Sequence, residues 1–332
     1  MTDKILASLR ALHLISAEQD AAIATYEREK PFSLYYELRT FLSLGVTLLS
    51  TGLGLLIYQN IDSIGHGAIV TVIALLSAAG FGYAYTRRQP FSWLENPKAS
   101  TSADYALLLA CLTFLTLVGY LQYQYNFFGT RYGLLVVVPT VVFFLCAYRF
   151  DHRGVLSMAI TGLAAWVGVS IAPLSAFTSN DYALPHLDWV AIVLGVALAA
   201  VGLASEYYDR KKHFGYTYLL LGSNLALIAA TSAMFRSSYS EAGFMPPVLA
   251  ALLIVVLSAG LYWYALRTHS YVFLLLGALY GYMAVTYLFF QLSDDRDWDV
   301  LGFIYFPLST VGVVILLLNV KKILGIHENK GV

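Results

Sequence analysis

Carboxylates gather next to the long apolar runs of this chain, and they are the residues whose type and spacing most suggest chemistry. They are Asp62, Asp188, Asp294, Asp295, Asp297 and Asp299. A carboxylate before a helix can accept backbone N–H bonds and complement the helix dipole, or several carboxylates can bind a cation. We favour helix caps, and keep an outer acidic face for a cation or a cationic partner as the alternative.

A calcium loop is the specific metal site that these acids suggest. Asp295, Asp297 and Asp299 match its first three ligand positions, but Val300 stands where the loop needs glycine and Phe306 where it needs a bidentate glutamate. We therefore expect no metal ligands and no cofactor.

Two other features lie inside apolar runs. Asn224 is strongly polar at mid-run, and such an amide more often joins two helices than contacts a substrate, so a mid-membrane site is the second choice. Gly277 and Gly281 form a GxxxG pair that allows close helix approach. Packing within the chain is the favoured use of the pair, ahead of oligomerisation.

The middles of the apolar runs lack Asp, Glu, Lys, Arg and His. Asp104, Glu206 and Arg39 lie near run ends instead. Proton relays and ion-coupled carriers commonly keep ionisable groups at mid-membrane, and intramembrane metalloenzymes need clustered ligands. This pattern argues against proton relays, ion-coupled carriers and intramembrane metalloenzymes. We therefore predict a protein that is not an enzyme and has no catalytic residues.

Composition assigns the chain to integral membrane proteins. It is 59% hydrophobic and only 12% charged, with a mean hydropathy of +0.68, which is too apolar for a water-facing globule. We predict an all-α polytopic protein with about ten transmembrane helices. The expected spans lie near residues 40–58, 66–85, 105–122, 132–148, 154–174, 189–205, 214–234, 247–266, 270–290 and 300–320.

Lysine and arginine predict the orientation. With a cytoplasmic N-terminus, every basic residue except Arg131, Arg236 and Arg296 falls on the inner side. Basic side chains resist translocation, so both termini are expected to be cytoplasmic. The outer face is then net negative.

The acidic and basic residues at the ends of the spans suggest an internal repeat. Asp188-Trp189 is echoed by Asp297-Trp298, and Lys211-Lys212 by Lys321-Lys322. We predict a parallel duplication of a four-helix unit, with chance similarity as the alternative. The expected organisation is a cytosolic or membrane-surface helical hairpin at 1–37, a first transmembrane hairpin at 38–88, units at 104–212 and 214–322, and a cytosolic tail at 323–332.

The N-terminal part also resembles a known family. Ser16 and Gln19 have the spacing of a capping box that opens the second helix of the hairpin. Together with a span ending Tyr58-Gln-Asn-Ile-Asp62, this start resembles an uncharacterised family of bacterial polytopic membrane proteins, a predicted membrane domain of unknown function. Ile61 stands where that family usually has an aromatic residue. The resemblance covers roughly the first 150 residues and implies a multi-span helical fold in the bacterial cytoplasmic (inner) membrane.

Three functions remain open at this point. The favoured one is a non-enzymatic membrane subunit or scaffold of a cell-envelope complex, with partners at the N-terminal hairpin and the outer acidic face. A transporter or carrier of a lipid or small molecule is second, and an enzyme acting on a lipid-linked substrate is third. The lipid bilayer is the expected surrounding and nucleic acid is not expected, while the sequence leaves the oligomeric state open.

Overall fold

The computed structural model describes residues 65–96, 100–171, 187–236, 246–292 and 298–320, together with Ser16, Gln19, Ala22, Ile23 and Leu48. Every regular element in these ranges is an α-helix. The predicted all-helical class is confirmed.

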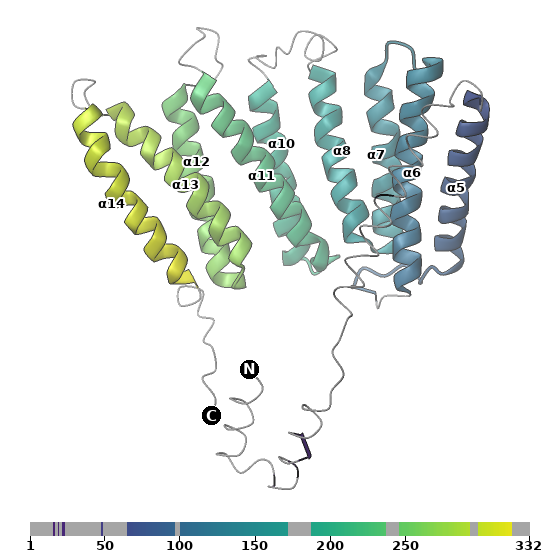
Figure 1. The fold of residues 1–332 in the computed structure, drawn as a ribbon, viewed down its shortest axis with the longest axis horizontal. Helices are drawn as coiled ribbons and strands as arrows, with labels where there is room; N and C mark the ends of the chain where they lie inside the picture. Colours follow the sequence, from purple (N-terminus) through teal and green to yellow (C-terminus); the bar gives the residue numbers. More distant parts are fainter. Residues whose placement is uncertain are drawn as a thin grey trace. The chain divides into compact units, whose positions relative to one another are not determined.

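The described helices run side by side (Figure 1). They are α5 (His66–Thr86), α6 (Thr101–Tyr125), α7 (Tyr132–Phe150), α8 (Arg153–Ile171), α10 (Leu187–Tyr207), α11 (Lys212–Arg236), α12 (Pro247–Thr268), α13 (Tyr271–Leu292) and α14 (Trp298–Leu318). Eight of these helices are long and apolar enough to cross a membrane, and α14 carries a shorter apolar stretch. Each coincides with one predicted span, whereas the first predicted span, 40–58, lies outside the described residues except for Leu48. The chain is therefore a multi-pass membrane protein.

Left-handed residues end three of the helices sharply. Asn126, Asp151 and His269 have φ values of 49°, 59° and 51° and follow α6, α7 and α12. The backbone N–H of each donates to the carbonyl four residues earlier, which satisfies one of the open acceptors at a helix end. Asparagine and aspartate tolerate this conformation better than most residues. The turn between α7 and α8 can therefore be very short.

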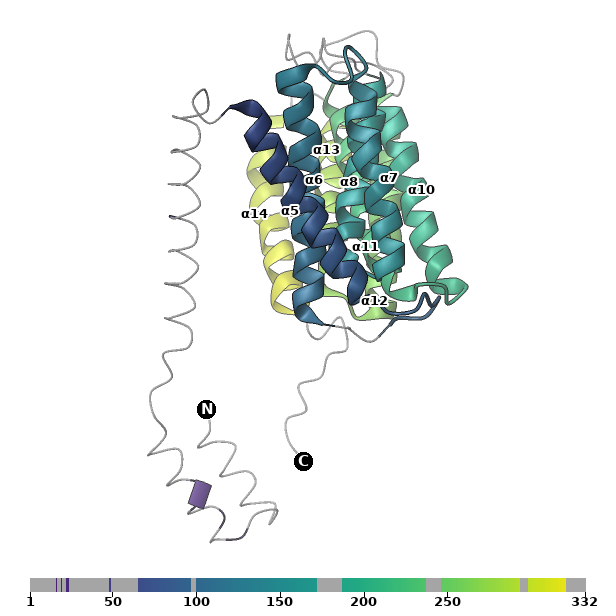
Figure 2. The same ribbon diagram turned by 90° about the vertical axis from the view of Figure 1, so that its right-hand side faces the viewer.

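Helix α11 lies at the centre of the packing. Successive helices pair as α5 with α6, α7 with α8, α10 with α11 and α12 with α13, and α11 also contacts α8, α12 and α13. Figure 2 views the same helices from the side. In the apolar part of α11, 56% of the residues are buried, against 11 to 33% in the other candidate spans. The tightest pair, α10 and α11, lies across the predicted boundary between 104–212 and 214–322. These two stretches therefore share a packed interface, and the repeat stays a prediction.

Glycines bring α10 and α11 close together. A Cβ added at Gly195 would lie 2.6 Å from the Gly222 carbonyl oxygen, and a Cβ at Gly222 would lie 2.6 Å from the Gly195 carbonyl oxygen. Backbone atoms cannot move aside for a side chain, so only glycine permits this approach.

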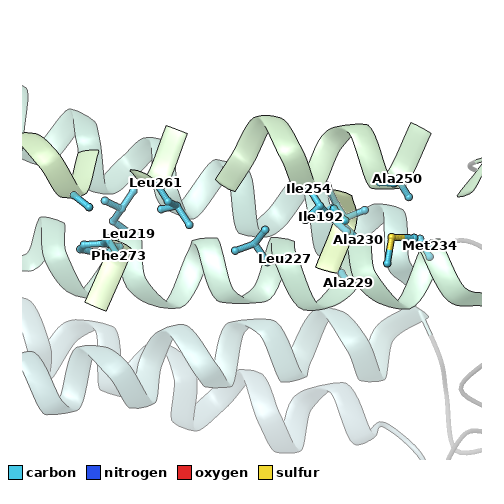
Figure 3. Packing of buried hydrophobic residues seen from close by; sticks show 14 of the residues in the cluster. Ile192, Leu219, Leu227, Ala229, Ala230, Met234, Ala250, Ile254, Leu261 and Phe273 are labelled. Carbon is cyan, nitrogen blue, oxygen red and sulfur yellow. The ribbon is translucent and has the colours of Figure 1, made fainter. Parts of the chain in front are cut away.

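Apolar side chains of α10 and α11 join two core clusters. One cluster continues into α12 and α13. In it, Ile192 of α10, Ala230 of α11 and Ile254 of α12 meet (Figure 3). The other cluster continues into α5 to α8 and includes Leu198 and Phe214. The two central helices thus link both halves of this helical body.

The capping box predicted near the N-terminus is confirmed. The Ser16 N–H donates to Gln19 Oε1 at 2.9 Å, and the Gln19 N–H donates to Ser16 Oγ at 3.2 Å. These residues belong to one unit of the chain, Met1–Gly65 with Gly325–Val332, and residues His66–Leu324 form the other unit.

Candidate functional site

One end of the helices is rich in basic side chains. We call the basic end the described residues 86–96, 100–101, 149–153, 207–213 and 267–271. Its basic residues are Arg87, Arg88, Arg149, Arg153, Arg210, Lys211, Lys212 and Arg267, whereas the described opposite ends carry Arg131 and Arg236. This charge imbalance directs attention to the basic end.

Segment 88–96, which follows α5, lies across the ends of other helices. The Asn96 N–H donates to Asp151 Oδ2 at 2.8 Å, after α7. The Lys211 N–H donates to the Trp93 carbonyl oxygen at 2.7 Å, before α11. The Arg149 guanidinium donates to the Gln89 carbonyl oxygen at 2.8 Å. Segment 88–96 is therefore held in place by contacts with the α7–α8 hairpin and with the start of α11.

A buried charge cluster anchors the same place. Lys211 Nζ lies 2.9 Å from Asp151 Oδ1, and His213 Nε2 contacts the same oxygen. The three side chains are almost fully buried, with exposed fractions of 7% for Asp151, 2% for Lys211 and 4% for His213. The Lys211 ammonium also lies 5.4 Å from the centroid of the Phe91 ring. We call these three residues the Asp151 cluster.

The surroundings of Asp151 favour its charged form. Burial by itself would raise the pKa of this carboxyl, but the Asn96 N–H, the Lys211 ammonium and His213 together lower it below its ordinary value. The carboxylate therefore stays ionised at neutral pH and holds Lys211 and His213 in place. Nδ1 of His213 is buried and has no hydrogen-bond partner among the described residues.

Within the described ranges, no group of three or more His, Cys, Asp or Glu side chains could hold a metal ion. The Asp151 cluster contributes one carboxylate and one imidazole, and the Lys211 ammonium occupies the carboxylate oxygen that they share. The arrangement therefore joins the turn after α7 to the start of α11 by ion pairing.

Two cavities lie beside segment 88–96. The first has a volume of about 270 Å³, and its charged lining comprises Arg87, Arg88, Arg149, Arg153, Glu95, Asp104 and Asp151. The second, about 380 Å³, is lined by Leu94, Glu95, Arg153, Asp209, Lys212 and His213. The basic end therefore combines hollows with a dense set of charges.

Three apolar side chains of segment 88–96 remain largely exposed. Phe91 and Trp93 are about half exposed, and Leu94 is 69% exposed. The Phe91 and Trp93 rings meet edge to face at 5.2 Å, and the Arg210 guanidinium lies 5.3 Å from the Trp93 ring centroid. An apolar surface with cations at its edge results.

The acids predicted to cap helices are only partly within the described residues. Asp62, Asp294, Asp295 and Asp297 lie outside them. Asp188 lies in the first turn of α10 and Asp299 in the first turn of α14. The capping role and the outer acidic face stay predictions.

The structure places Asn224 and the GxxxG pair clearly. The Asn224 amide donates to the Leu220 carbonyl oxygen of its own helix at 2.8 Å. A Cβ at Gly277 would lie 2.9 Å from the Ser258 carbonyl oxygen, and one at Gly281 would lie 3.3 Å from Ser258 Cβ. The pair thus lies at the contact between α13 and α12.

Sequence reasoning missed the Asp151 cluster. From the sequence, Lys211 predicts only the orientation of the chain and the repeat, and no role is predicted for Asp151 or His213. One signal was present, because Asp151 is an acid in the short turn between two spans, among basic residues. Nothing in the sequence paired it with Lys211.

The fold defines a multi-pass helical membrane protein. Residues 7–156 match the model of a family described as "Predicted membrane protein (DUF2157)", which confirms the resemblance inferred for the N-terminal part of the chain. The match includes segment 88–96 and Asp151 but ends before Lys211. Neither a curated protein nor a solved structure matches the chain.

Proposed function

We propose that this protein is a non-enzymatic membrane subunit or scaffold of a cell-envelope complex, and that a partner protein docks on segment 88–96. One observation supports the proposal above all. The Asp151 cluster and the backbone hydrogen bonds hold this segment in a fixed shape, yet Phe91, Trp93 and Leu94 remain exposed. Apolar side chains on a fixed backbone outside the spans are suited to recognition.

Binding energetics favour such a surface. A segment that is already ordered loses little conformational freedom when a partner binds. Aromatic side chains and arginine are enriched among the residues that dominate interface energies. Arg210 beside Trp93, and Arg153 and Lys212 near Leu94, suit a partner with an apolar patch bordered by acidic residues.

The setting is also part of the proposal. Because the basic end carries most of the described lysines and arginines, the positive-inside rule favours a cytoplasmic location for it. We propose that the membrane is the bacterial inner membrane and that both chain termini lie on this same side. The N-terminal hairpin and the outer acidic face would offer further contacts. The partner at segment 88–96 is then a cytosolic protein or the cytosolic part of a membrane protein.

Affinity purification of the full chain in mild detergent tests the docking. We expect a companion protein at a fixed ratio with the native chain, and its loss in Leu94→Asp. Phe127→Asp is the matched control, because Phe127 is equally exposed in the turn after α6 at the opposite end. The native chain purifying alone, or a companion that survives Leu94→Asp, would contradict the proposal.

A carrier of a lipid or small apolar molecule is the second candidate function. A cavity of about 520 Å³ lies among residues of α11 and α13, with Phe235, Leu279, Tyr282 and Met283 in its lining. Mass spectrometry of the purified protein tests this function. A carrier should retain an apolar molecule that Leu279→Trp displaces, whereas an empty native protein would argue against it.

A further inference from the structure

We propose that the arginine-lined cavity at the basic end binds a phosphate-bearing anion. Its four arginines come from three places in the chain: Arg87 and Arg88 follow α5, Arg149 lies in the last turn of α7, and Arg153 begins α8. We call this hollow the arginine cavity.

The charge balance of the arginine cavity favours an anion. Of its acids, Glu95 pairs with Arg153 at 2.8 Å, and Asp151 pairs with Lys211, which is not in the lining. Three guanidinium groups, those of Arg87, Arg88 and Arg149, then share the cavity with one carboxylate, Asp104. An anion of more than one negative charge would restore the balance.

The arginines keep donors for a ligand. Arg87 and Arg88 lie 6.0 and 3.4 Å from the ring centroids of Tyr83 and Tyr85, contacts that orient a guanidinium through its face. Arg149 uses one terminal nitrogen for the Gln89 carbonyl oxygen. Because a guanidinium has five N–H donors, each of these side chains can still donate to an oxyanion.

Phosphate is the anion that this geometry suits best. The planar fork of arginine matches two phosphate oxygens at once, and such charge-assisted pairs are stronger than neutral hydrogen bonds. The first turns of α6 and α8 also line the cavity, through Ala103 and Gly154, and helix N-termini attract phosphate. The volume of about 270 Å³ equals about nine waters at roughly 30 Å³ each, which leaves room for a phosphate and the group it carries.

The cavity lies at the ends of the candidate spans α5 to α8. Basic pockets between spans bind anionic lipid headgroups. The phosphate could therefore belong to a lipid or to a soluble phosphate ester, and both present the same oxyanion to the same arginines. Occupancy of this cavity does not depend on the partner proposed for Phe91, Trp93 and Leu94, which are not in its lining.

Binding to the full chain in neutral detergent separates these sources. One arm adds phosphatidylglycerol or, for comparison, zwitterionic phosphatidylcholine, and the other adds inorganic pyrophosphate at constant ionic strength. Affinity is measured for the native chain and for Arg87→Gln/Arg88→Gln. Arg267→Gln is the control, because Arg267 lies at the basic end over Trp263, at 4.1 Å from its ring centroid, outside the cavity lining.

The double variant should lose about tenfold or more in affinity, as expected for the removal of charge-assisted contacts, while Arg267→Gln stays near the native value. Preference for phosphatidylglycerol alone identifies a lipid ligand, and binding of pyrophosphate as well identifies a soluble phosphate group as sufficient; either supports the site. The proposal is overturned if neither probe binds, or if Arg267→Gln weakens binding as much as the double variant. Circular dichroism of each variant confirms that it is folded.

Discussion

Asp151 accepts contacts from three donors that belong to segment 88–96 and to the start of α11. Its position follows from the sharp left-handed turn after α7, which presents the carboxylate to both neighbours. Removing one partner of a buried ion pair is far more harmful than lacking the pair altogether, because the remaining charge stays desolvated. The stability of the basic end should thus depend strongly on this residue.

We predict that Asp151→Asn lowers the free energy of unfolding by about 3–5 kcal/mol, because it leaves the buried Lys211 ammonium without a countercharge. Thermal unfolding of the detergent-solubilised chain, followed by circular dichroism, measures the change. Asp209→Asn is the control, since the Asp209–Lys212 pair is 3.4 Å apart and Asp209 is 72% exposed, so about 0–1 kcal/mol is expected. Equal losses in both variants would refute the role of the cluster.

The lowered pKa of Asp151 also predicts a pH dependence. A carboxyl whose pKa is lower in the folded state contributes its full stabilisation above its ordinary pKa of about 3.9, and loses it as the pH falls through the folded value. The melting temperature of the native chain should therefore fall more steeply on acidification below about pH 4 than that of Asp151→Asn. Parallel curves for the two proteins would show that Asp151 is not the group involved.

At the scale of elements, the interface between α10 and α11 rests on glycine. Gly195 and Gly222 bring the two backbones so close that a methyl group would meet backbone atoms rather than mobile side chains. By contrast, a Cβ at Gly260 of α12 would meet nothing within 4 Å. These glycines provide a matched comparison.

Gly222→Ala should force α10 and α11 apart and destabilise the chain by about 1–3 kcal/mol, the usual range for overpacking. Gly260→Ala should be neutral or slightly stabilising, because alanine has the higher helix propensity. Thermal unfolding midpoints in one detergent give the comparison. A neutral Gly222→Ala would mean that the two helices are not in such close contact.

The helices could be predicted from the sequence because each apolar run has the length of a membrane span and ends at polar or left-handed residues such as Asn126 and Asp151. Which helices pack together could not be predicted. Spans that are apolar on every side carry no amphipathic pattern, so the central place of α11 emerges only in three dimensions. The pairing of Asp151 with Lys211 could not be predicted either, because the two residues lie far apart in the chain.

For the molecule as a whole, we predict that the basic end faces the cytoplasm. Cysteines at Tyr208, in the turn after α10, and at Phe127, in the turn after α6, report on the two ends. The background is Cys111→Ala with Cys146→Ala, which removes both native thiols. A membrane-impermeant maleimide added to intact cells should label Phe127→Cys and spare Tyr208→Cys, and the reverse pattern would invert the predicted orientation.

A photo-crosslinking residue at position 94 in native membranes would show what contacts segment 88–96, because Leu94 is the most exposed large apolar residue of this segment. The same residue at position 145, on the exposed face of α7, reports contacts with lipid. We expect a discrete protein adduct from position 94 and none from position 145. Adducts with lipid alone at position 94, or the same protein adduct from both positions, would contradict a docking surface on segment 88–96.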